Sequence, residues 1–269
     1  MRVVPSVAGQ QRLHVHDRSD AGLSSVTFSL PVRLGMNFLA GGLLMVALAY
    51  DWLGNVAHEI IGTVMLVLLI AHNTFNRRWY ARAAKGGRNL RGWVNIVVIV
   101  SLLSTMLVLL VTSLMISRSM FSVLPLSGNY IARQVHGLTA YWALIIASVH
   151  VGMRWSMIMG VTSGWLRISD RSNVRTAVLR TLAVAIAAYG IHSSFVIGVR
   201  SRLMAEITMN FWDFSQPSLG FFLHIASIMV LYACSGHYAM KLASVLNLAR
   251  NGRQDRLPDA RKGRPWAIK

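Results

Sequence analysis

The chain has 269 residues, of which 54% are hydrophobic and only 13% are charged. This composition excludes an ordinary soluble domain and indicates a membrane protein. The formal net charge of +18 does not point to nucleic acid as a partner, because the basic residues are divided among four segments that alternate with apolar stretches. We interpret this charge as setting the membrane topology and contacting anionic membrane lipids.

Six apolar windows follow one another along the chain, each near the roughly 20 residues that a membrane-spanning helix needs. They cover residues 34–50, 60–76, 93–117, 135–153, 181–199 and 218–240. The first window is the weakest, because it contains Asn37 and the pair Gly41-Gly42 and ends close to Asp51. We still count it as a span. The predicted fold is therefore all-α, with six transmembrane helices.

The basic residues predict how these helices are oriented. Of the 27 lysines and arginines, 23 lie before residue 34, within 77–92, within 154–180 or after residue 240. The positive-inside rule therefore predicts that both termini are cytoplasmic. No apolar signal-peptide region precedes the first window, so we expect the protein to insert by its own helices.

Four of the nine histidines form two pairs with identical spacing. His58 and His72 belong to the second predicted helix, and His136 and His150 belong to the fourth. Fourteen residues make four turns of a 3.5-residue helix, so each pair stacks two imidazoles on one face, about 21 Å apart. Both helices run in the same direction, so we expect His58 to meet His136 near the outer surface and His72 to meet His150 deeper toward the cytoplasm.

Paired imidazoles inside an apolar helix bundle are suited to haem iron in an electron-transfer site. Two axial nitrogens fill both faces of the iron, apolar walls tune its potential, and basic groups pair with the haem propionates. The four matched histidines are therefore the predicted ligands of two haems. The arginines predicted to bind the propionates are Arg77, Arg78 and Arg154. Because Cys234 is the single cysteine, a C-x-x-C-H attachment site is excluded and both haems are expected to be b-type and non-covalent.

The other histidines of the apolar windows do not repeat this spacing. His224 and His237 are 13 residues apart, which turns the second about 140° away from the first. We interpret both as hydrogen-bonding or site-lining residues, with replacement of one haem ligand as the alternative. His192 is predicted to be a buried hydrogen-bonding histidine. Near the outer surface, Glu59 or Asp51 is a candidate acceptor of a substrate proton, the alternative being a topological or interfacial role.

The fourth window carries the clearest resemblance to a known family. The run His-Gly-Leu-Thr-Ala-Tyr-Trp-Ala-Leu-Ile-Ile-Ala-Ser-Val-His at residues 136–150, continued by Val-Gly-Met-Arg-Trp, resembles the paired-histidine helix of the bacterial flavinylation-associated cytochromes. Residues 34–79 are similar to a second copy. The run Phe-Trp-Asp-Phe-Ser-Gln-Pro-Ser-Leu-Gly-Phe-Phe at residues 211–222 resembles the family's C-terminal hairpin.

The resemblance covers most of residues 34–243 and implies a b-type cytochrome of a bacterial inner membrane. It implies haem ligation by His58, His72, His136 and His150. It also implies quinone as a further ligand, and electron transfer from quinol to a redox partner that carries flavin. In that setting the chain would be an electron-transfer cytochrome, acting as the membrane subunit of a quinol-oxidising oxidoreductase.

The predicted organisation has four parts. They are a cytoplasmic tail at 1–33, a four-helix cytochrome b-like di-haem domain at 34–157, a linker with a C-terminal transmembrane hairpin at 158–243, and a basic cytoplasmic tail at 244–269. Two alternative functions stay open. In one, the histidines relay protons in a transporter. In the other, the chain is a non-catalytic membrane subunit that docks a soluble redox partner through its basic loops.

Overall fold

The computed structural model describes residues 32, 34–85, 90–121, 123, 128–165, 172–206, 212–215 and 217–254. Across this part of the chain the fold is all-helical, as predicted, and contains no strand. A short apolar helix, Leu34–Ala47, comes first. It is followed by α2 (Tyr50–Lys85), α3 (Leu90–Ile116), α4 (Tyr130–Met153), α5 (Trp155–Trp165), α6 (Asn173–Val196), α7 (Val199–Leu203) and α8 (Ser218–Gln254).

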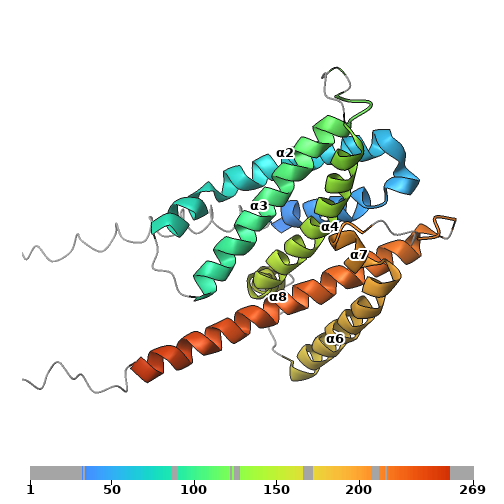
Figure 1. Ribbon diagram of the computed structural model, residues 1–269. Coiled ribbons are helices and arrows are strands. Elements are labelled where there is room, and N and C mark those ends of the chain that lie inside the picture. The colour runs from blue at the N-terminus through green and yellow to red at the C-terminus, as the bar shows by residue number, and fades with distance from the viewer. Residues whose placement is uncertain are drawn as a thin grey trace, which may run out of the picture.

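Five of these helices are long and apolar enough to cross a membrane. Their candidate spans are Tyr50–Arg77, Leu90–Ile116, Tyr130–Met153, Asn173–Val196 and Ser218–Leu246. They contain nearly all of the second to the sixth predicted window, which indicates a multi-pass membrane protein. In Figure 1, α2, α4 and α8 run in one general direction, and α3 and α6 run in the opposite direction. Histidines at the start of α2, α4 and α8 therefore lie toward the same end of the bundle.

Among the described residues, the first window gives a shorter helix, so a sixth span is not confirmed. Its helix, Leu34–Ala47, is about 21 Å long at 1.5 Å per residue, whereas the hydrocarbon core is about 30 Å thick. Leu44 and Ala49 are only 4% and 2% exposed, so this segment packs against the bundle. Gly54 then interrupts the helical path with φ 71° and ψ 177°, a conformation that glycine adopts without steric cost. Because the helix is too short to cross, the side on which the N-terminal tail lies stays a prediction.

α4 and α8 form the centre of the bundle. The most extensive helix contacts run in the order α3, α4, α8 and α6 (Figure 1). Backbones approach closely at three glycines. A Cβ atom on Gly152 of α4 would collide with the Ala233 carbonyl of α8, and one on Gly236 of α8 would collide with the Val149 carbonyl of α4. A Cβ atom on Gly190 of α6 would likewise collide with the Ser227 carbonyl of α8. Small residues at helix crossings are a common means of packing in membranes, and here they set the register of α8 against both neighbours.

The buried apolar cluster lies where α4, α7 and α8 meet the short first helix. Its members are Leu44, Ala49, Tyr141, Leu144, Ile145, Ile197, Val199, Phe221, Ile225 and Ile228. The candidate span of α2 contributes none of them, and no residue in its most apolar stretch is buried. Helix α2 is therefore packed loosely beside the bundle, and it contacts the core through the partly buried side chains of Trp52, Leu53 and Met65.

Candidate functional site

The two outer histidines come together in the structure. His58 of α2 and His136 of α4 have ring centroids 6.0 Å apart, and their ring planes are inclined by 72°. Tyr50 packs edge-on against His58, with a centroid distance of 5.2 Å. The helices α2 and α4 are not among the closely packed pairs, so the imidazoles are a principal contact between them.

Thr112 of α3 holds the His136 ring in place. Its side chain is buried, and Oγ1 donates a hydrogen bond of 2.7 Å to the Val108 carbonyl oxygen while lying 3.0 Å from His136 Nδ1. A hydroxyl group has a single proton, so both contacts form together in the tautomer of His136 that carries its proton on Nδ1 and donates it to Thr112. In that tautomer the lone pair of a neutral His136 ring is on Nε2, which is the atom left to bind a metal or accept a proton.

The two inner histidines lie about four helical turns deeper on the same helices. His150 of α4 interacts electrostatically with His72 of α2 and with Arg154. Nδ1 of His150 is buried and has no hydrogen-bond partner among the residues that the structure describes. Nδ1 of His58 is also buried and makes no hydrogen bond of good geometry with these residues, although the backbone of Ala47 lies close to the His58 ring. Buried polar atoms normally have partners, so these two nitrogens call for a ligand or a bound group.

The three arginines predicted to bind propionates are placed differently. Arg154 is the C-cap residue of α4, one turn beyond His150, and donates a hydrogen bond of 3.2 Å to Asn95 Oδ1. Arg77 is exposed on α2, and the side chain of Arg78 lies outside the described residues. Only Arg154 is thus seen to lie in a cavity.

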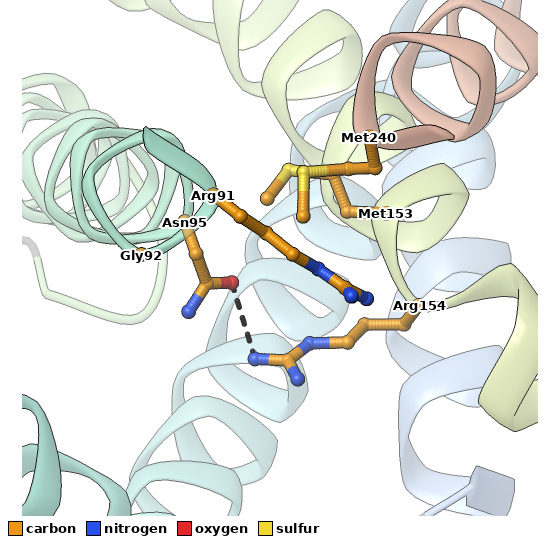
Figure 2. A pocket seen from close by; sticks show the side chains of 6 residues that line it. All are labelled: Arg91, Gly92, Asn95, Met153, Arg154 and Met240. Atoms are coloured by element: carbon orange, nitrogen blue, oxygen red, sulfur yellow. Dashed lines mark hydrogen bonds between the residues drawn. The ribbon is translucent and has the colours of Figure 1, made fainter. Parts of the chain in front are cut away.

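Sequence reasoning missed Arg91, which lines that cavity with Arg154 (Figure 2). Arg91 lies in the first turn of α3, four residues before Asn95, so the two side chains share one helical face. This i, i+4 relation was visible in the sequence. Two successive antiparallel spans also place the start of α3 beside the end of α4, but only the structure shows that both arginines line one cavity.

His224 belongs to a separate polar cluster between α6 and α8. Its Nδ1 lies 2.8 Å from Ser193 Oγ, and Ser227 Oγ donates to the same Ser193 oxygen at 2.8 Å. Tyr189 stacks on the His224 ring with a centroid distance of 5.4 Å and an interplanar angle of 19°. The cluster agrees with the interpretation of His224 as a hydrogen-bonding histidine.

His192 is placed differently from its prediction. The sequence predicted a buried residue, but His192 is exposed on α6, with its ring 6.3 Å from that of His224. The prediction was wrong because α6 presents most of its surface outward and contacts the bundle mainly along the narrow face that packs on α8. His237 packs edge-on against Tyr238 and is half-buried.

Glu59 of α2 binds the segment that follows α3. Its Oε1 accepts hydrogen bonds from Asn55 Nδ2 at 2.7 Å and from the Arg118 backbone N–H at 2.8 Å. Its Oε2 accepts from Ser117 Oγ at 2.9 Å and from the Met120 backbone N–H at 2.8 Å. Because donors occupy both carboxylate oxygens, this arrangement favours a structural role for Glu59 over acceptance of a substrate proton.

No protein-family model, curated protein or solved structure matches this chain. The resemblance to flavinylation-associated cytochromes therefore rests on the sequence runs around the histidines of α4 and at the C-terminal hairpin. Within the described residues, no group of three or more histidine, cysteine, aspartate or glutamate side chains is arranged to hold a metal ion. Pairs of histidines suit haem iron, because the porphyrin supplies its other four ligands.

Proposed function

We propose that the protein is a b-type cytochrome that moves electrons between the two faces of a bacterial inner membrane on two non-covalent haems. His58 and His136 would hold the outer haem, and His72 and His150 the inner one. The single observation that supports this most directly is the 6.0 Å separation of the His58 and His136 ring centroids. At this separation the two imidazoles would be close enough to hold one iron between them, because metal–imidazole bonds are about 2 Å long.

The surroundings of the pair also suit a flat macrocycle. A Cβ atom added to Gly62, one turn after His58, or to Gly137, beside His136, would meet no other atom within 4 Å. The loose packing of α2 leaves the histidine-bearing helices free of close backbone contact with each other. Two buried Nδ1 atoms that make no hydrogen bond of good geometry within the described residues, one at each level, further support ligand-binding roles for His58 and His150.

Bound haem iron supplies one-electron redox chemistry, and the residues of this chain supply position and environment. Thr112 orients His136 so that Nε2 points away from α3. The two histidines are spaced equally on the two parallel helices, so one haem could be held at each level of the membrane. Electrons would then pass from the haem at one level to the haem at the other. A proton relay in a transporter does not require that equal spacing. The proposed electron donor is a quinol and the proposed acceptor is a partner that carries flavin, both from the family resemblance.

A redox difference spectrum of the full-length protein, purified after expression with adequate haem supply, tests the proposal. We expect a b-type signal and two haems per chain. The variant His72→Ala should retain one haem, because the outer pair is intact. The variant His224→Ala is the matched control and should retain two, because Ser193 and Tyr189 already engage its ring. A preparation without haem that transports a substrate into vesicles would overturn the proposal in favour of a transporter.

A further inference from the structure

A cavity of about 330 Å³ opens where the start of α3, the end of α4 and the inner part of α8 meet. Its lining residues are Arg91, Gly92, Asn95, Met153, Arg154 and Met240. Figure 2 shows both arginine side chains extending into this space, with the two methionines together on one side of it. The volume is at the lower end of the range for small-molecule sites.

The cavity brings two positive charges together without an acidic residue in its lining. Arg154 is half-buried, and burial together with the positive charge of Arg91 lowers the pKa of the Arg154 guanidinium. One of its donors is used by Asn95 Oδ1 at 3.2 Å. A guanidinium has five donors in a planar fork, so both arginines keep donors for an anion.

The depth of the cavity favours a phospholipid as the source of that anion. The candidate span of α3 begins at Leu90 and that of α4 ends at Met153, so both arginines lie at the boundary of the apolar region. This is the level at which lipid phosphates lie, and the same end of the bundle carries most of the basic residues. Met153 and Met240 supply an apolar wall on which the lipid stem can pack.

The sequence predicted that Arg154 binds a haem propionate, and the cavity offers a second anion for the same side chain. Its described lining comes from α3, α4 and α8, and α2 contributes no residue up to Arg77, the last one of α2 whose side chain the structure describes. The proposed inner haem lies between α2 and α4, because it uses His72. Arg154 also interacts electrostatically with His150, so haem content has to be measured beside lipid retention.

We propose that Arg91 and Arg154 form a binding site for the phosphate group of an anionic phospholipid at the cytoplasmic end of the bundle. Basic pockets between transmembrane helices on that side are a known type of lipid-headgroup site. Asn95 positions the Arg154 guanidinium, and Arg91 closes the exposed side. The proposal does not depend on haem, because its ligand and its lining residues are separate from the histidine pairs.

The test uses the full-length protein in nanodiscs of phosphatidylcholine that contain phosphatidylglycerol as the minor lipid. Lipid retained after transfer to detergent is counted by native mass spectrometry, and haem content is measured on the same sample. We expect phosphatidylglycerol to be retained preferentially. Each basic residue near a membrane surface contributes about 1 kcal/mol, so Arg91→Gln and Arg154→Gln should each lower retention about fivefold.

Two control variants separate this effect from misfolding and from general charge loss. Arg154→Lys keeps the positive charge but loses the planar fork, so it should retain more phosphatidylglycerol than Arg154→Gln and less than the parent. Arg77→Gln removes the same charge from an exposed position on α2 and should leave retention unchanged. Equal loss of lipid in Arg77→Gln and in the two cavity variants would overturn the proposal.

Two further outcomes would assign the cavity to another anion and would also overturn the proposal. If millimolar inorganic phosphate displaces phosphatidylglycerol from the parent protein, the site is one for free phosphate. If Arg91→Gln and Arg154→Gln lose haem but keep the lipid, the arginines bind a haem propionate. Lipid loss with unchanged haem content is the result that supports the assignment.

Discussion

Thr112 Oγ1 lies 3.0 Å from His136 Nδ1 and links α3 to the outer histidine pair. The Thr112 hydroxyl also donates to the Val108 carbonyl oxygen at 2.7 Å, and both contacts form together when His136 carries its hydrogen on Nδ1. A partner of this kind orients a metal-binding histidine and raises its basicity. Under the proposed function, the residue that orients His136 therefore comes from a helix with no histidine of its own.

Replacing Thr112 with valine should weaken the outer haem. The change keeps the shape of the side chain but leaves His136 Nδ1 without its acceptor, and losses of this kind typically cost 10–100-fold in affinity. Haem content and a redox titration measure the effect, and we expect the second haem to be retained. Thr105→Val is the matched control, because the Thr105 hydroxyl donates to the Leu102 carbonyl of its own helix. Full occupancy and an unchanged potential in Thr112→Val would contradict the orienting role.

Replacing Glu59 with alanine should destabilise the outer end of the bundle. The carboxylate accepts three hydrogen bonds of 2.8–2.9 Å that join α2 to the segment after α3, and a fourth of 2.7 Å from Asn55 of α2 itself. Removing a charged acceptor of this kind costs about 1–3 kcal/mol. Thermal unfolding in detergent measures the loss, and limited proteolysis should show faster cleavage near Ser119. Asp51→Ala, at an exposed position one or two turns earlier, serves as the control and should change neither measurement.

Replacing Gly152 with alanine should force α4 and α8 apart. The added methyl group would collide with the Ala233 carbonyl oxygen, and overpacking at such a crossing costs about 1–3 kcal/mol. Gly160→Ala on α5 is the control, because its methyl group would meet no atom within 4 Å. That change should stabilise the protein by about 0.5–1 kcal/mol through helix propensity. Equal effects in denaturant unfolding of the two variants would show that close approach at Gly152 is unimportant.

Replacing Ser193 with alanine should destabilise the contact between α6 and α8 without changing haem content. His224 Nδ1 would lose its partner at 2.8 Å, and a buried ring nitrogen left unpaired costs about 1–3 kcal/mol. Ser194→Ala is the neighbouring control, because its hydroxyl donates to the Gly190 carbonyl of its own helix. Loss of a haem from Ser193→Ala would instead indicate that His224 is a ligand.

The sequence predicted those features that depend on local composition and helical phase. Five of six windows form helices of spanning length, because the free energy of burying an apolar segment in lipid is set by its own residues. The 14-residue spacing of His58 and His72, and of His136 and His150, is read from the sequence, and helix geometry alone then predicts that each pair lies on one face of its helix. The direction of each helix then follows from its place in the chain, because successive spans run in opposite directions.

Only the tertiary structure decided how those helices meet. The window at 34–50 reads as a span by composition, but Leu44 and Ala49 pack in the core, and Gly54 turns the backbone. Each further site residue is important because of a partner far away in the sequence. Thr112 meets His136, 24 residues later, and Ser193 meets His224, 31 residues later. Arg91 shares a cavity with Arg154, 63 residues later. Contacts between distant residues depend on which backbones can approach, here through Gly152 and Gly190, and no local pattern along the chain encodes that choice.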